Sequence, residues 1–197
     1  MNKPLGRTIG NLLEVQEAIA SLNNQGPEDL KELAVTLAAL TLVATKEQLT
    51  LQEAKNEVLK VFASLKPLSI FYDFVNAQGG DVNYIKNINN MKKAKFIIPI
   101  KISTSGYLVF NDNYLLGELS VLLGVGKLVK EDIIDPTAGI VLKATHGDKV
   151  AKNQVIFELH TNKPKIKHQE FQMLANKIFS ISKEKPQIEP LIFKIIM

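Results

Sequence analysis

The sequence predicts an α+β protein with helices in its first 80 residues and a β-rich remainder. Apolar residues recur at helical spacing across residues 11–77, and glycine and proline separate the segments. Two β-patterned runs, 139–144 and 155–160, flank a Gly147-Asp148 turn. With 197 residues, of which 46% are hydrophobic, the chain can form one or two domains with an apolar core.

Composition excludes several classes of site. The chain has no cysteine, which rules out disulfides, thiolate zinc sites and a cysteine nucleophile. Its first residues lack the basic head and apolar core of a secretory signal, so we expect a cytoplasmic protein. The longest apolar run, 33–44, contains Thr36 and Thr41 and falls short of the roughly 20 residues that span a bilayer. We therefore expect a core helix there and no membrane partner.

The charge pattern argues against nucleic acid as a partner. The net charge of +4 comes from 24 basic and 20 acidic residues, and Arg7 is the sole arginine. Specific base readout commonly uses the planar guanidinium group, which this chain almost lacks. The lysine clusters at 92–95 and 163–167 have no interleaved aromatic residues for base stacking, so we interpret them as solvated faces.

Four helices are expected in the first part. The first covers residues 11–22, with Asn11 and Glu14 as a capping arrangement. Gly26-Pro27 then breaks the chain before a second helix that reaches residue 44. Thr50 and Glu53 form a second capping box and open a third helix over 51–65. Pro67 precedes a fourth helix over 68–77, and an asparagine- and lysine-rich connector follows over 81–94.

The second part reads as strands with short helices. Residues 95–102 alternate as a strand, Ser105-Gly106 forms a turn, and residues 107–110 are expected to pair back onto the strand. A short helix over 115–123 precedes the two runs at 139–144 and 155–160, which suit a small β-sandwich or barrel. A surface helix over 164–179 and a closing strand over 191–196 complete the prediction.

A carrier function is one alternative for the β-rich part. Biotin and lipoyl carriers share the Gly-Asp-x-Val rhythm of residues 147–150, but they need a target lysine at a hairpin tip. Lys143 lies inside the expected strand instead, so this alternative fails.

Four motifs in order indicate a family. The sequence reads Leu-Gly-x-Gly-Lys, Ile-Asp-x-x-x-Gly, Gly-Asp-x-Val and Leu-His-x-Asn, at residues 123–127, 134–139, 147–150 and 159–162. The first part carries GRTIGNLLEVQEAI, GPEDLKEL and AQGGD. Together these segments resemble the C-terminal half of the pyrimidine-nucleoside phosphorylase and thymidine phosphorylase family, over nearly the whole chain. Lys127, where arginine is usual, and Asn153, where glycine is usual, depart from the family pattern.

The resemblance implies a fold and a reaction. It assigns residues 1–80 to the helical part of an incomplete α/β-domain, 81–94 to a connector, and 95–197 to a barrel-sandwich-like C-terminal domain. Family members transfer a pentosyl group from a pyrimidine nucleoside to inorganic phosphate, which releases the free base and a pentose 1-phosphate. They form homodimers through an α-domain that this chain is expected to lack.

The family residues that bind phosphate and base belong to a segment that precedes the matched one. We therefore expect no catalytic and no substrate-binding residue in this chain. It should be active only if a second chain supplies an N-terminal half. The alternative is a non-catalytic binding or interaction module from a truncated or decayed gene.

One family site carries over, a structural potassium ion. The resemblance places its ligands at the backbone carbonyls of Leu5 and Thr8 and at the carboxylate of Glu17. Oxygen ligands suit such a hard cation. Thr8 replaces the usual alanine, to which a carbonyl ligand is insensitive.

The remaining polar residues do not predict chemistry. His146, His160 and His168 have no pairwise spacing of four residues for a metal, so we interpret them as surface or packed histidines. Among the nearby carboxylates Glu131, Asp132 and Asp135, the last precedes Pro136 and is expected to form a turn.

Overall fold

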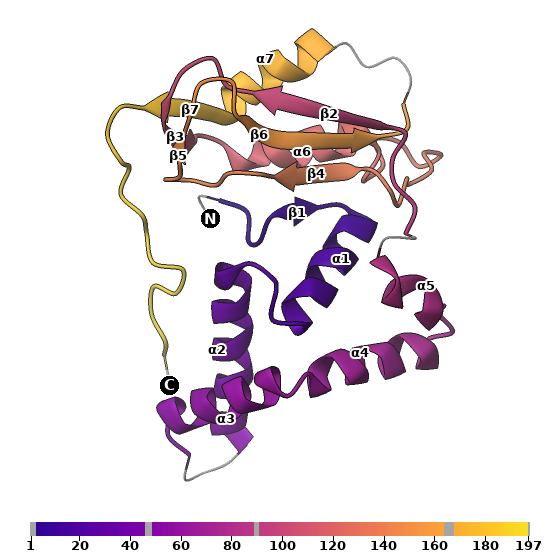
Figure 1. The fold of residues 1–197 in the computed structure, drawn as a ribbon, viewed down its shortest axis with the longest axis vertical. Coiled ribbons are helices and arrows are strands. Elements are labelled where there is room, and N and C mark those ends of the chain that lie inside the picture. The colour runs from indigo at the N-terminus through magenta and orange to yellow at the C-terminus, as the bar shows by residue number, and fades with distance from the viewer. Residues whose placement is uncertain (1–2, 46–48, 89–90, 164–167, 197) are drawn as a thin grey trace. The chain divides into compact units, whose positions relative to one another are not determined.

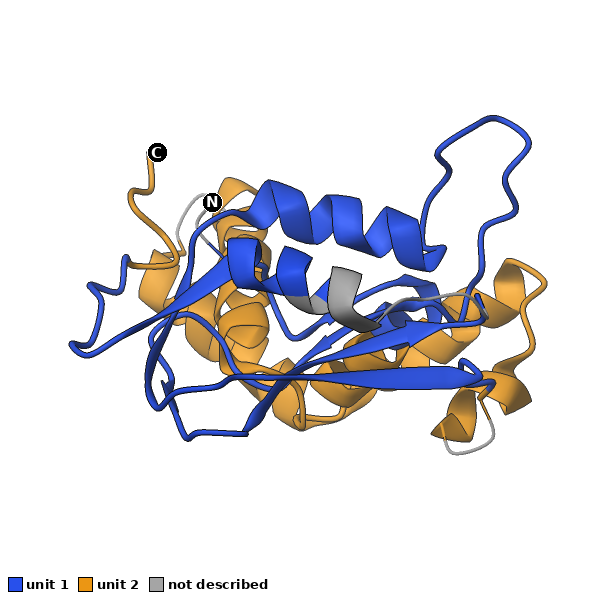
Figure 2. Cartoon of the chain, turned by 90° about the horizontal axis from the view of Figure 1, so that it is seen from above, with its two compact units in different colours: residues 1–15, 92–189 blue, residues 16–91, 190–197 orange. Residues whose placement is uncertain are grey.

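The protein combines helices and sheets, which confirms the α+β class (Figure 1). The computed structural model describes residues 3–45, 49–88, 91–163 and 168–196. The chain forms two compact units, coloured separately in Figure 2. Unit 1 contains residues 1–15 and 92–189, and unit 2 contains 16–91 and 190–197. The predicted division at residues 80 and 95 assigned residues 1–15 to the helical part and residues 190–197 to the C-terminal domain. The structure groups residues 1–15 with the sheets and residues 190–197 with the helices.

The predicted helices form close to their expected positions. They are α1 (Asn11–Leu22), which runs from unit 1 into unit 2, followed by α2 (Glu28–Thr45), α3 (Leu51–Ala63) and α4 (Lys66–Ala77). The capping box of α3 is confirmed, because Glu53 N donates to Thr50 Oγ1 and Thr50 N donates to Glu53 Oε2. The hydrogen bonds from the Thr50 side chain and backbone lower the pKa of the Glu53 carboxyl.

Two details of the helical part differ from the prediction. At the start of α1, Glu14 accepts a hydrogen bond from Gly10 N at 2.9 Å, and Asn11 is already the first helical residue. The predicted connector contains a short helix, α5 (Val82–Lys86), whose Asp81 cap accepts from Tyr84 N. Both starts depend on a local acidic side chain that satisfies a free backbone N–H group.

Unit 1 contains two antiparallel sheets. The first has the order β1-β4-β6-β2 and the second β5-β3-β7, so neither closes into a barrel. Barrel closure is therefore not confirmed. The strands are β1 (Thr8–Ile9), β2 (Phe96–Lys101), β3 (Gly106–Phe110), β4 (Gly139–Leu142), β5 (Lys149–Val150), β6 (Val155–Thr161) and β7 (Phe179–Ser182). The helices α6 (Asn113–Leu123) and α7 (His168–Ile178) accompany them. Residues 164–167 of the predicted surface helix lie outside the described residues.

One predicted strand pairing and one predicted strand are wrong. The segment over 107–110 forms β3 but pairs with β5 and β7, while β2 pairs with β6. A turn signal such as Ser105-Gly106 indicates a change of direction and cannot identify a partner distant in sequence. The closing strand predicted over 191–196 does not form, and the final strand is instead β7. An apolar run forms a strand only where it finds a free sheet edge, whatever its β propensity. In the second sheet, β7 pairs with β3, whose Leu108 and Phe110 belong to the core.

The core of unit 1 joins both sheets to α6 and α7. Phe157 of β6 is fully buried and lies edge-on to Phe179 of β7, with ring centroids 5.5 Å apart. Phe110 of β3 contacts the same ring at 5.9 Å. Leu119 and Leu123 of α6 are also fully buried in this cluster. Burial of this kind contributes on the order of 2 kcal/mol for each large side chain.

The backbones of β1 and β4 approach each other closely at Gly139. A Cβ atom there would collide with the carbonyl oxygen of Ile9 and approach Leu13 Cδ1. In contrast, a Cβ atom on Gly117 of α6 would meet no atom within 4 Å. The two glycines therefore form a matched pair, one required by packing and one in open space.

We predict that Gly139→Ala lowers the free energy of unfolding by about 2–4 kcal/mol, because β1 must move away from β4. Gly117→Ala should raise it by about 0.5–1 kcal/mol, since alanine restricts the unfolded chain and favours a helix. Urea unfolding followed by circular dichroism measures both. Equal effects of the two substitutions would contradict the close approach of β1 to β4.

Candidate functional site

A cluster of hydrogen-bonded polar side chains in unit 1 lies where β6 ends and the chain enters β4. Asp135 precedes β4, and its Oδ1 accepts hydrogen bonds from Thr137 N at 2.9 Å and Thr137 Oγ1 at 2.8 Å. Its Oδ2 accepts from Asn162 Nδ2 at 2.8 Å. Asn162 follows β6, so this contact joins two segments 27 residues apart. We call Asp135, Thr137 and Asn162 the strand-end cluster.

The strand-end cluster also holds the entrance to β2. Asn162 Nδ2 lies 2.9 Å from Thr137 Oγ1, and Asn162 Oδ1 accepts a hydrogen bond from Lys95 N at 2.7 Å. The amide of Asn162 therefore uses both its donor and its acceptor side. One side chain thus connects the residues next to β2, β4 and β6.

The C-terminus of α6 joins the same region. Buried Thr161 donates from Oγ1 to the carbonyl oxygen of Leu123 at 2.8 Å, and Lys163 Nζ donates to that of Leu122 at 2.7 Å. Asp135 N donates to the carbonyl oxygen of Gly124 at 2.9 Å. These donors satisfy carbonyl groups that the end of a helix leaves without partners, and they fix α6 against the sheet.

Hydrogen bonding keeps Asp135 ionised. Burial of this carboxyl favours a higher pKa, but the hydrogen bonds from Thr137 and Asn162 outweigh it and hold the pKa of Asp135 below its ordinary 3.8. The unfolded chain therefore takes up this proton more readily than the folded chain. The stabilisation is present above pH 3.8 and is lost as the pH falls through the lower folded pKa. Because its polar atoms bond to one another, the cluster suits a structural connection better than acid–base chemistry.

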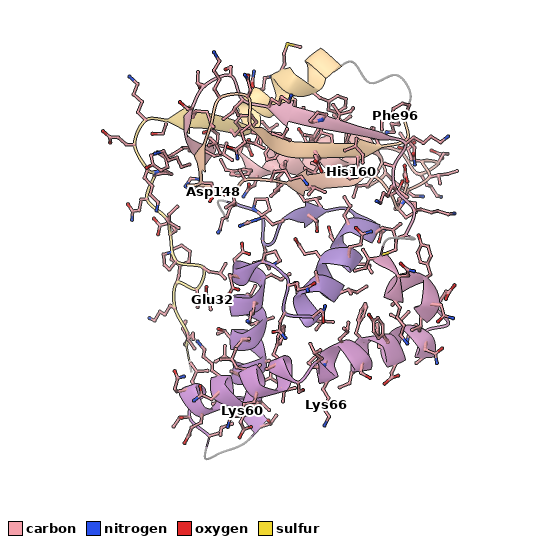
Figure 3. All side chains as sticks on the ribbon, in the orientation of Figure 1. Glu32, Lys60, Lys66, Phe96, Asp148 and His160 are labelled. Carbon is pink, nitrogen blue, oxygen red and sulfur yellow. The ribbon has the colours of Figure 1, made fainter. Side chains whose placement is uncertain are left out.

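The strand-end cluster explains three of the four sequence motifs. The segments 123–127, 134–139 and 159–162 contribute Gly124, Asp135 and Asn162, which lie within hydrogen-bond contact of one another through Asp135. The fourth motif forms the turn before β5, in which Asp148 Oδ2 accepts from Thr145 N at 2.8 Å. Figure 3 labels Asp148 at this turn. Sequence reasoning identified Asp135 as a turn former but missed Asn162, whose role depends on a contact across the fold.

The histidines and the loop carboxylates occupy separate places. His146 Nδ1 accepts a hydrogen bond from Phe110 N at 3.1 Å, which ties the turn before β5 to β3. His160 is buried on β6, as expected for a packed histidine. The backbone of His168 begins α7, and its side chain lies outside the described part of the structure. Asp132 accepts from Leu128 N and Val129 N, which lower the pKa of this exposed carboxyl.

The predicted potassium ligands belong to different units. Leu5 and Thr8 lie in unit 1, where Thr8 pairs with Val141, and Glu17 lies on α1 in unit 2. Two carbonyl groups and a carboxylate are suitable donors for potassium. The potassium site itself stays a prediction. Within the described ranges, no three histidine, cysteine, aspartate or glutamate residues are grouped to hold a metal ion. In the same residues, no helix is long and apolar enough to cross a membrane.

We predict that Asn162→Ala lowers the free energy of unfolding by on the order of 1–3 kcal/mol, because it leaves Asp135 and Lys95 N without this partner. It should also raise the pKa of Asp135 toward its ordinary value, so that the stability deficit of the variant is full above pH 3.8 and shrinks as the pH falls below it. The matched control is Asn111→Ala, which removes a single exposed hydrogen bond from Ser180. Urea titrations at neutral and acidic pH would contradict the role of the cluster if both variants behaved alike.

Comparison with known proteins agrees with these motifs. Residues 107–182 match the family model described as pyrimidine nucleoside phosphorylase C-terminal domain. This range runs from β3 to β7 and includes the strand-end cluster.

Curated relatives extend the similarity into the helical part. Pyrimidine-nucleoside phosphorylases of the Staphylococcus aureus strains USA300, NCTC 8325 / PS 47 and COL are each 42% identical over 166 residues. The aligned region is 83% of this chain and 38% of each relative. The chain thus spans little more than a third of the length of these relatives. By its motifs, its family domain and its relatives, residues 107–182 belong to the C-terminal domain of the pyrimidine-nucleoside phosphorylase family, and the chain is similar to part of the length of these relatives.

Proposed function

We propose that this chain serves as the C-terminal part of a pyrimidine-nucleoside phosphorylase. Such an enzyme transfers a pentosyl group from a pyrimidine nucleoside to inorganic phosphate and releases the free base. The observation that carries the proposal is the 42% identity to relatives with this printed name over 83% of the chain. The matched region is 38% of those relatives, so we propose that a further phosphorylase segment supplies the phosphate- and base-binding groups.

The reaction sets requirements for that segment. Phosphate and the developing charge of the sugar need preorganised donors, which act mainly by position and electrostatics. The strand-end cluster uses its polar atoms internally, so its part in the reaction is to hold the C-terminal domain in one shape. We assign no catalytic residue to this chain.

The outer face of α4 supports a packing role for the missing segment. None of the residues of α4 is buried, and Ile70 and Phe74, one helical turn apart, are 62% and 59% exposed. Apolar patches of this kind commonly mark contact surfaces. We propose that this face packs against the segment that completes the enzyme. A cytoplasmic location, thymidine or uridine as substrate, and family-type homodimers belong to the same proposal.

We predict that the purified chain with phosphate does not cleave thymidine or uridine alone, and that it does so when mixed with the remaining segment of a Staphylococcus aureus relative. Release of free base, followed by ultraviolet absorbance, measures the reaction. Activity of the chain alone would refute the need for a second segment. Absence of activity in the mixture would favour the alternative of a non-catalytic interaction module.

Variants of α4 sharpen this experiment. Ile70→Lys combined with Phe74→Lys should abolish activity in the mixture and leave the circular dichroism of the chain unchanged, since both side chains are exposed. Ser69→Lys combined with Asn76→Lys adds the same two charges at exposed positions on the opposite side of the helix and should preserve activity. Equal losses in the two cases would exclude this face as the contact surface.

We also propose that Leu5, Thr8 and Glu17 contribute ligands to a structural potassium ion in the completed enzyme. The ion would stabilise the assembled protein through oxygen ligands and would take no part in the chemistry. We predict that potassium raises the melting temperature of the mixture more than sodium does at equal ionic strength. Glu17→Gln should remove this difference, whereas Glu32→Gln, at an exposed position of α2, should retain it. A difference that survives Glu17→Gln would exclude Glu17 as a ligand.

A further inference from the structure

Three charged or titratable side chains form a second cluster on the first sheet. Glu158 and His160 lie two residues apart on β6 and therefore share a face, and Lys143 directly follows β4. Lys143 Nζ lies 2.9 Å from Glu158 Oε2, and His160 Nε2 lies 3.8 Å from the same oxygen. We call these residues the lysine–glutamate–histidine cluster. Figure 3 labels His160 within the sheet.

His160 is enclosed without a hydrogen-bond partner for Nε2. The residue is 8% exposed, and no described atom lies within hydrogen-bond distance of Nε2. In the strand register, His160 faces Ile97 of β2 and Gly139 of β4, and neither carries charge. The charged groups that act on the imidazole are Glu158 and Lys143.

Lys143 and His160 compete for one carboxylate. At 3.8 Å, Glu158 attracts a charged imidazole but does not form a hydrogen bond with it. Burial disfavours the imidazolium, the charge of Glu158 favours it, and the charge of Lys143 disfavours it. Burial is the largest of these effects, and the resulting pKa of His160 lies below its ordinary 6.5. A neutral imidazole fits this site, whereas a protonated one requires Glu158 to turn away from Lys143 or water to enter.

We propose that the lysine–glutamate–histidine cluster makes the C-terminal domain sensitive to mild acid, because His160 can remain buried on β6 only while it is neutral. The folded chain takes up this proton less readily than the unfolded chain. Stability is therefore complete above pH 6.5 and declines as the pH falls toward the lower folded pKa. This window lies above the one in which Asp135 titrates.

Urea unfolding of the full chain at about pH 7.5 and about pH 5.5 tests the proposal. The urea concentration at the unfolding midpoint of the original chain should be lower at the acidic pH than at the neutral pH. His160→Gln should lose most of this fall, because glutamine does not titrate. Lys143→Met should also reduce the fall, since it frees Glu158 for His160. Lys149→Met removes a lysine of β5 without a contact to Glu158 and should keep the fall unchanged.

Imidazole titration by nuclear magnetic resonance provides a second readout that does not require His160→Gln to fold. The three histidine signals can be assigned from His146→Gln and His168→Gln. The His160 signal should titrate below pH 6.5 and move to higher pH in Lys143→Met. Titration of His160 at or above pH 6.5 would overturn the proposal, and so would a His160 titration that does not move in Lys143→Met. An equal fall in the stability of His160→Gln and of the original chain would overturn it as well.

Discussion

The antiparallel pairing of β4 with β6 is the constraint on which the rest of the C-terminal domain depends. β6 also pairs with β2 and β4 with β1, so this pair occupies the centre of the first sheet. Its inward residues, Ile140, Phe157 and Leu159, are fully buried. At one end of the pair, Asn162 and Asp135 close the two strands and set their register. A shift of one residue in either strand would turn its core-facing side chains to the other face of the sheet, so this closure fixes the core as well as the sheet.

The polar side chains described above mainly stabilise the fold of this domain. Asp135, Thr137 and Asn162 form hydrogen bonds with one another, and Thr161 and Lys163 hold the end of α6. Net contributions of about 1 kcal/mol for each such bond are modest, but leaving a buried partner unpaired costs more. A domain so connected can present a fixed surface to a neighbouring segment. That property agrees with the proposal that the reacting groups come from another part of a phosphorylase.

The elements that the sequence predicted well depend on local signals. Thr50 with Glu53 starts α3 where expected, and the apolar spacing over 11–22 matches α1 to the residue. Partner choice was missed because it depends on contacts distant in sequence, as shown by β3, whose Phe110 pairs with Phe179 of β7, 69 residues further along the chain. Asn162 gave no local signal for its contact with Asp135. The family motifs nevertheless identified the segments that meet there, because both residues lie within them.

Hydrogen exchange of the full chain tests the central role of β4 and β6 most directly. The amides of Val141 and Glu158, which pair between β4 and β6, should exchange most slowly in the chain, because their release requires the central strand pair to open. Amides of α4, which has no buried residue, should exchange much faster. Exchange of the β4 and β6 amides at the rate of α4 would contradict the account and would show that another part of the chain holds the fold together.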